Sequence, residues 1–232
     1  MASLSPFRLV LAFVLFAMLS VTANNRFAHS QTATTPAPNK SLLLGVPDSD
    51  EGLPGVGPIC RADWFVPNWN ELRRAWAERV AADRGALVFL GDSITQGWGK
   101  NLGGAFGNVK VANRGISGDT TRGMLVRLDD DVLALDPSGV VMLMGTNDLD
   151  QGGSPATAAG NVKLILAELK QHDPKLPIVL CAVFPSSAEE NRPAAKIRAL
   201  NRLLADAVKG DPQITLVDTW TLFANPEGDA KI

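Results

Sequence analysis

The stretch Leu87-Val88-Phe89-Leu90-Gly91-Asp92-Ser93 is an apolar run that ends abruptly in a glycine and two polar residues. A continuous apolar run is typical of a strand that is buried on both faces of a parallel sheet. Glycine permits a tight turn after the strand, and a hydroxyl placed there lies at the carboxyl edge of the sheet, where binding sites form. The stretch therefore predicts a buried parallel strand that leads into a functional loop.

The same alternation of buried strands and amphipathic helices continues along the chain. The expected strands are 86–90, 109–112, 140–144, 178–184 and 214–217. The expected helices are 68–83, with Asn68 as its N-cap, 121–133, and two more built around Val162–Leu169 and Ile197–Val208. This pattern predicts an α/β domain, a three-layer α/β/α sandwich whose five-stranded parallel sheet has the flavodoxin-like order 2-1-3-4-5. An antiparallel α+β domain would need half-polar strands and hairpin turns, which the sequence does not show.

Composition sets limits on the class of protein. The chain has 232 residues, of which 46% are hydrophobic and 20% charged, and its formal net charge is −2. These values fit one globular domain with appendages. A charge this close to zero gives no reason to expect nucleic acid or an anionic membrane surface as a partner.

The first 23 residues have the pattern of a secretory signal peptide. Arg8 precedes the apolar run Leu9–Leu19, and small residues follow up to Ala23. The run is shorter than the roughly 20 apolar residues of a membrane span, so an uncleaved anchor is the weaker alternative. We therefore expect export to the periplasm or the extracellular space, with no stable membrane span after cleavage.

Residues 24–60 are rich in Thr, Ser, Pro, Gly and Ala without a helical or strand period, so they are expected to form a flexible linker or arm before a domain at 61–232. Export would permit a disulfide between Cys60 and Cys181. However, Cys181 lies in an expected buried strand, where free cysteine is common. Two independent thiols are therefore favoured over a bridge, which stays open as the alternative.

Polar, glycine-bearing loops follow the first three expected strands. They are Gly91-Asp92-Ser93, Ser117-Gly118-Asp119 and Gly145-Thr146-Asn147-Asp148. In a parallel sheet all three lie at one edge. Each alone has an ordinary explanation, because Ser93 could cap a helix and Asn147 could form an Asx-turn. Their recurrence on successive strands favours a site.

With these blocks, and with Asn113–Thr120 before the second loop, the chain resembles the SGNH or GDSL hydrolases. It is most similar to the branch that contains platelet-activating-factor acetylhydrolase catalytic subunits and bacterial acetyl esterases, and the resemblance runs from about residue 86 to 232. It implies a serine ester hydrolase that acts on small acyl esters, with acetylated carbohydrate as one candidate, and the signal-peptide pattern adds the expectation that this hydrolase is exported.

The resemblance also implies residue roles. Ser93 would be the nucleophile, and the oxyanion donors would be the N–H groups of Ser93 and Gly118 and the side-chain amide of Asn147. Apart from the resemblance, we interpret Asp92, Asp119 and Asp148 mainly as residues that brace the loops by bonding to nearby backbone N–H groups. No Walker loop, His-Glu-x-x-His pair or Cys-x-x-Cys occurs, so no cofactor or metal is expected. The expected partner is a small-molecule ester.

A serine nucleophile also needs a base, usually a histidine held by a carboxylate. The resembling family places Asp-x-x-His after the fifth strand, before a last helix. The chain has two histidines: His29 lies just after the signal peptide, and His172 is expected at a helix end on the edge of the sheet opposite Ser93. The sequence therefore looks C-terminally truncated before that block and the last helix, and weak or no activity is expected.

Two alternatives stay open beside the hydrolase. One is a catalytically silent pseudoenzyme that binds carbohydrate or ester through the retained oxyanion loops. The other is a flavodoxin-like ligand-binding domain without hydrolase ancestry, which the three matching blocks disfavour.

Overall fold

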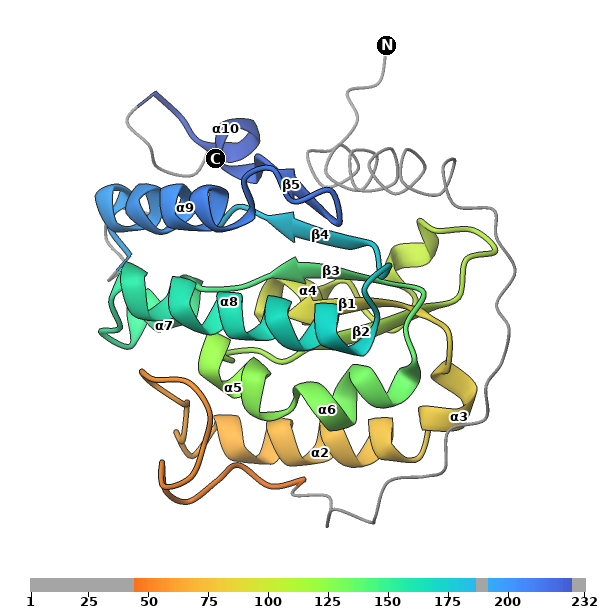
Figure 1. Cartoon of the computed structure of the whole chain (residues 1–232). Helices are drawn as coiled ribbons and strands as arrows, with labels where there is room; N and C mark the ends of the chain where they lie inside the picture. Colours follow the sequence, from red (N-terminus) through yellow and green to blue (C-terminus); the bar gives the residue numbers. More distant parts are fainter. Residues whose placement is uncertain (1–43, 187–191, 227–232) are drawn as a thin grey trace.

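Five parallel strands form a single sheet in the computed structural model, which describes residues 44–186 and 192–226. The strand order is β2-β1-β3-β4-β5, which confirms the predicted topology (Figure 1). The strands are β1 (Leu87–Gly91), β2 (Val111–Gly115), β3 (Gly139–Leu143), β4 (Ile178–Cys181) and β5 (Ile214–Val217). The expected signal peptide, residues 1–23, lies outside the described residues.

Helices and loops cover both faces of the sheet, and successive side chains of a strand point alternately to the two faces. Val88 and Val140 belong to the core that packs against α5 (Thr121–Val126), α6 (Leu128–Asp131), α8 (Pro155–His172) and α9 (Ala194–Val208). Phe89 and Val141 belong to the core on the other face, which includes residues of α4 (Ser93–Gly97), η1 (Leu102–Gly104) and α10 (Thr219–Phe223). This two-sided burial explains why the strands read as continuous apolar runs.

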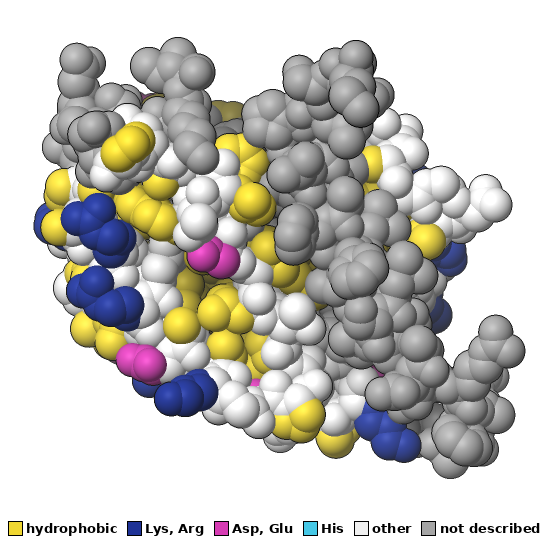
Figure 2. Space-filling view, turned by 90° about the horizontal axis from the view of Figure 1, so that it is seen from above, with side chains coloured by type: hydrophobic (Ala, Val, Ile, Leu, Met, Phe, Trp, Pro, Cys, Tyr) yellow, Lys and Arg dark blue, Asp and Glu magenta, His cyan; other side chains and the backbone are white. Residues whose placement is uncertain are grey.

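The edge strand β5 is less completely covered than the strands inside the sheet. All five residues of β1 are buried, whereas one of the four residues of β5 is, and Leu216 is 38% exposed. Figure 2 looks down on the side where β5, α9 and α10 lie, and hydrophobic side chains are visible there. No helix in the described part of the chain is long and apolar enough to cross a membrane.

The prediction of one helix over 68–83 is wrong in its bounds. Helix α2 (Phe65–Ala77) begins three residues earlier, with Trp64 as its N-cap, and the short helix α3 (Val80–Asp83) follows after a break. Asn68 therefore lies inside α2 and caps nothing. Its side-chain amide instead exchanges hydrogen bonds of 3.4 and 3.2 Å with the amide of Gln96 on α4.

The helix expected over 121–133 is also interrupted. It consists of α5, α6 and the 3₁₀ turn η2 (Leu133–Leu135). The first break falls at Arg127, whose φ of −98° and ψ of 4° leave the helical region. Amphipathic spacing alone did not reveal this break.

Residues 44–64, which we call the N-terminal segment, pack against the domain. The backbone N–H and C=O of Val56 both bond to the side chain of Asn161 on α8, at 3.1 and 2.8 Å. Thr120 Oγ1 donates to the Pro58 carbonyl at 2.7 Å, and Arg122 Nη1 pairs with Asp50 at 2.7 Å. Thus residues 44–60 differ from the flexible arm expected over 24–60, because side chains of the domain satisfy their backbone groups. Residues 24–43 lie outside the described part.

A buried ionic cluster ties α2, α3 and α6 to the ends of β1 and β2. Arg127 is fully buried; its Nε donates to Asp119 Oδ2 at 2.8 Å, and its Nη1 lies 3.3 Å from Asp131 Oδ2. Its Nη2 donates to the Arg114 carbonyl at 2.8 Å and to the Gly91 carbonyl at 3.4 Å. We call the following residues the arginine cluster: Arg73, Arg114 and Arg127 with Asp83, Asp119 and Asp131, all buried.

The substitution Arg127→Met is expected to destabilise the protein strongly, because it leaves the buried carboxylates of Asp119 and Asp131 without their shared partner. Breaking a buried ion pair from one side typically costs about 3–5 kcal/mol. Urea unfolding would measure the loss. The control is Arg84→Met, which removes an exposed pair at 4.0 Å with Asp136 and should change the unfolding free energy little. Similar losses in the two variants would contradict this account of the cluster.

Candidate active site

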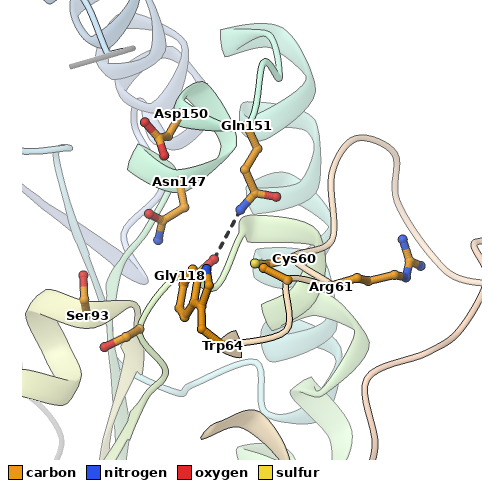
Figure 3. Close-up of a pocket in the computed structure, with 10 residues that line it drawn as sticks. Cys60, Arg61, Trp64, Ser93, Gly118, Asn147, Asp150 and Gln151 are labelled. Carbon is orange, nitrogen blue, oxygen red and sulfur yellow. Dashed lines mark hydrogen bonds between the residues drawn. The ribbon is translucent and has the colours of Figure 1, made fainter. Parts of the chain in front are cut away.

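A cavity of about 510 Å³ opens where the chain leaves the carboxyl ends of β1, β2 and β3 (Figure 3). Ser93, Gly118 and Asn147, which the sequence assigned to one site from three separate loops, all line it. The structure therefore brings the three residues together. The remaining lining residues are Cys60, Arg61, Ala62, Trp64, Ser117, Asp150 and Gln151.

Ser93 is the first residue of α4, directly after β1, and it is exposed to solvent. The side chain that caps α4 is that of Asp92, whose Oδ1 accepts from the Ile94 N–H at 3.0 Å. The alternative in which Ser93 caps the helix does not hold, so its hydroxyl is left for the cavity. As the first N–H of a helix, the Ser93 N–H has no partner within α4.

Gly118 sits in the second loop with φ of +84°, in the left-handed region that favours glycine. A Cβ built there would lie 2.3 Å from Cη2 of Trp64. Both the backbone conformation and the close approach of the indole therefore require glycine. Within the described residues, no hydrogen bond involves the Gly118 N–H.

The loop that carries Gly118 is fixed on both sides. The Ser117 N–H donates to Gln96 Oε1 at 2.6 Å, and Gln96 is itself held by Asn68 of α2. Asp119 accepts from the Thr120 N–H at 2.9 Å as well as from Arg127. Donors fixed before the reaction are what a developing negative charge requires, because they need no reorganisation as the charge forms.

Asn147 lies on α7 (Thr146–Asp150), and its side chain is mostly buried. Its Nδ2 donates to the backbone carbonyl of Asp119 at 2.9 Å, across 28 residues of sequence. This bond links the second and third loops, so the side chain does not form a local Asx-turn. An amide nitrogen carries two hydrogens, so the orientation that this bond fixes leaves one N–H for the cavity.

The three aspartates of these loops are buried and each accepts a backbone N–H. Asp148 accepts the N–H and the hydroxyl of Thr121, which connects α7 to the start of α5. Burial raises the pKa of Asp148, raises the pKa of Asp92 to about 6, and raises the pKa of Asp119 to about 7 although Arg127 favours its charged form. These carboxyls serve to position the loops.

Neither cysteine is bridged. Cys60 and Cys181 are both buried free thiols, as the sequence favoured. Burial raises the pKa of Cys60 and raises that of Cys181 to about 12, so neither is a thiolate at neutral pH. Among the described residues, no group of three His, Cys, Asp or Glu side chains is arranged to hold a metal ion.

His172 cannot reach Ser93. It is the last residue of α8, and its Nε2 lies 3.5 Å from Asp136, which precedes β3 at the amino edge of the sheet. Ser93 lies at the carboxyl edge. His29 is outside the described residues, so the described part of the chain places no histidine at the cavity.

The profile of the GDSL-like lipase/acylhydrolase family matches residues 89–231, which is more than half of the chain. The chain therefore belongs to this family of hydrolases, as its sequence motifs indicated.

Similar proteins agree with this assignment. The chain is 26% identical over 167 residues to the platelet-activating factor acetylhydrolase IB subunit alpha1 of Bos taurus, covering 69% of each protein. It is 27% identical over 149 residues to the alpha2 subunit of Homo sapiens, covering 61% of this chain and 62% of that one. The crystal structure of a GDSL-like lipase from Bacteroides thetaiotaomicron superposes with a TM-score of 0.59 at 26% identity, covering 68% of this chain and 82% of that chain.

Sequence reasoning missed one wall of the cavity. Residues 60–62 and Trp64 line it, yet they precede the first strand by more than twenty residues and carry no motif. Only the packing of the N-terminal segment onto α5 and α8 brings them to the carboxyl edge of the sheet.

The substitution Asp92→Asn is expected to flatten the pH dependence of stability. The pKa of Asp92 is about 6 in the folded chain and near 3.8 when solvated, so the native state binds more protons between these values. Its contribution to stability is therefore present at low pH and is lost as pH rises through about 6. Asparagine keeps an oxygen for the Ile94 N–H without titrating.

Urea unfolding of both proteins at about pH 4 and about pH 7.5 would measure the effect. The wild type should lose roughly 2 kcal/mol more than the variant over this range, because one pKa unit corresponds to about 1.4 kcal/mol and part of the shift of about two units lies below pH 4. Parallel pH profiles for the two proteins would contradict the assignment.

Proposed function

We propose that this protein is a serine acylhydrolase that cleaves small acyl esters, with Ser93 as the nucleophile. The oxyanion donors in this proposal are the N–H groups of Ser93 and Gly118 and the free N–H of Asn147. The observation that carries the proposal is the meeting of these three residues, from three successive loops, in one cavity. Hydrogen bonds to Gln96 and Arg127 and the Asn147–Asp119 bond hold these loops.

In the proposed reaction, Ser93 Oγ forms a bond to the ester carbonyl carbon, and the carbonyl electron pair moves onto the oxygen that faces the three donors. The serine proton passes to a base. Collapse of the tetrahedral intermediate breaks the bond to the alcohol, which leaves with a proton, and the acyl group remains on Ser93. Water then hydrolyses this acyl-enzyme and regenerates the serine.

The relatives that are named acetylhydrolases support a short acyl group. The cavity is larger than an acetyl group needs, since volumes of about 300–1,000 Å³ hold drug-sized ligands. Most of it is therefore available to the alcohol portion, and acetylated carbohydrate is our candidate. The apolar run before residue 20 supports export as part of the proposal.

The proton acceptor has no assigned residue in the described part of the chain, since His172 lies at the opposite edge of the sheet. This observation favours a second candidate function, a catalytically silent protein that binds esters at the same cavity. Because Ser93 is exposed, small bases from solvent can reach its hydroxyl. That exposure makes the two candidates experimentally separable.

A fluorophosphonate probe is expected to label Ser93, which peptide mass spectrometry would locate. Labelling should disappear in Ser93→Ala and persist in Ser117→Ala, which removes the other serine hydroxyl of the cavity. Labelling should be slow and should accelerate with added imidazole, because loss of a triad base typically costs on the order of 10⁴–10⁶ in rate.

Other outcomes would decide against parts of this proposal. Labelling that survives Ser93→Ala would exclude Ser93 as the nucleophile. No labelling with or without imidazole would favour the silent binding protein. Fast labelling that imidazole does not change would mean that the chain itself supplies a base to Ser93.

A further inference from the structure

Part of the cavity wall comes from outside the segment that defines the family. The family profile begins at residue 89, whereas Cys60, Arg61, Ala62 and Trp64 belong to the N-terminal segment. Ser93, Gly118 and Asn147 lie within the matched region. The catalytic loops and this wall are thus separate parts of the chain, and the wall is a place where substrate choice can be set without altering the catalytic loops.

Trp64 is the large aromatic side chain of this wall. It is 62% exposed, yet its position is defined on two sides. Its ring atoms Cη2 and Cζ3 lie against Gly118, where an added Cβ would meet them at 2.3 and 3.0 Å, and the ring packs edge-on to Phe65 with centroids 5.8 Å apart. Figure 3 shows the indole beside Gly118, on the same cavity as Ser93. The exposed apolar surface of the Trp64 indole therefore lies next to the proposed oxyanion site.

The N-terminal segment is fixed to the domain, so the position of Trp64 is already set. The bonds from Val56 to Asn161 and from Pro58 to Thr120 attach it to α8 and to the start of α5. Arg122 donates to the Gly57 carbonyl at 2.9 Å. Helix α2 then begins directly after Trp64, so both sides of this residue are anchored.

The charges around Trp64 are largely compensated. Arg61 donates to the Pro47 carbonyl at 2.7 Å and pairs with Asp50 at 2.5 Å, and its side chain extends away from Ser93 in Figure 3. Asp150 lies 3.9 Å from Arg192. Gln151 donates to the Gly118 carbonyl at 3.4 Å, which leaves its amide oxygen as an acceptor. The wall therefore offers an aromatic surface with a carboxylate and an amide beside it, and its cation, Arg61, is engaged by Asp50 and the Pro47 carbonyl.

We propose that Trp64 is a specificity-determining residue that packs against the ring of a neutral, hydroxyl-bearing alcohol, whose acyl ester is attacked by Ser93. This inference rests on the proposed hydrolase function. The C–H face of a pyranose-type ring matches the indole, and its hydroxyls match Asp150 and Gln151 as hydrogen-bond partners. A quaternary ammonium alcohol would also bind an indole and a carboxylate, but the proximity of Arg192 to Asp150 favours the neutral ring.

Binding to the Ser93→Ala protein tests the inference without turnover. The ligands are a monoacetylated methyl pyranoside and acetylcholine, titrated by NMR. Adding Trp64→Ala should weaken pyranoside binding roughly tenfold, about 1.4 kcal/mol, while Trp64→Phe, which keeps an aromatic surface, should weaken it less. Val56→Ala is the matched control: it removes another exposed apolar side chain of the same segment, and the Asn161 bonds involve only its backbone.

Three results would overturn the inference: no pyranoside binding to the Ser93→Ala protein, affinity that does not change with Trp64→Ala, or Trp64-dependent binding of acetylcholine in preference to the pyranoside. If Trp64→Ala loses its fold by circular dichroism, Trp64→Leu keeps an apolar contact with Gly118 without the flat ring and gives the same comparison. Fluorophosphonate labelling of Ser93 in the single variant Trp64→Ala reports on the hydrolase proposal separately. Labelled Ser93 with unchanged pyranoside binding would reject the role of Trp64 alone.

Discussion

The guanidinium of Arg127 is the interaction on which the positions of the site loops depend. It donates to the carbonyls of Gly91 and Arg114, which lie at the carboxyl ends of β1 and β2, and to the carboxylate of Asp119 in the loop that carries Gly118. A fully buried charge is tolerated only when its donors are satisfied, and the carboxylates of Asp119 and Asp131 compensate it. The rings of Trp69 and Trp76 lie 5.8 and 5.6 Å from this guanidinium and exclude water. The first two loops therefore share one rigid point behind the cavity.

The same burial has an energetic consequence for the carboxyls. Asp92, Asp119 and Asp148 hold backbone N–H groups in place, but burial raises the pKa of each. Their charged forms are therefore less stable in the folded chain than in water, and the protein accepts this cost where the loops must be fixed. Such a conflict between stability and positioning is common at functional sites. The exposed Ser93 therefore lies at the start of a loop that these hydrogen bonds hold in place.

The fold and the three loops could be predicted from the sequence because both follow from local rules. Strands such as 140–144 are apolar because both faces are covered, and parallel strands bring their carboxyl ends to one edge. The break at Arg127 and the early start of α2 at Phe65 could not be predicted, because both residues make tertiary contacts. The Arg127 side chain bonds to the carbonyl of Gly91, 36 residues away, and Phe65 packs in one cluster with Ile116. For the same reason, Trp64 was missed: contacts of Val56 with Asn161, 105 residues away, bring its segment to the cavity. The positions found from sequence are those whose geometry is local to a strand end.

In the proposed hydrolase, Ser93, Gly118 and Asn147 act on the same oxygen of a reacting ester. A crystal structure of the protein after reaction with a phosphonate ester tests it most directly, because the phosphoryl oxygen of the adduct stands for the oxyanion. We expect an adduct on Ser93 Oγ whose phosphoryl oxygen lies within hydrogen-bond distance, about 2.7–3.1 Å, of the Ser93 and Gly118 nitrogens and Asn147 Nδ2. An adduct on another residue, or a phosphoryl oxygen that points to solvent away from Gly118 and Asn147, would contradict it.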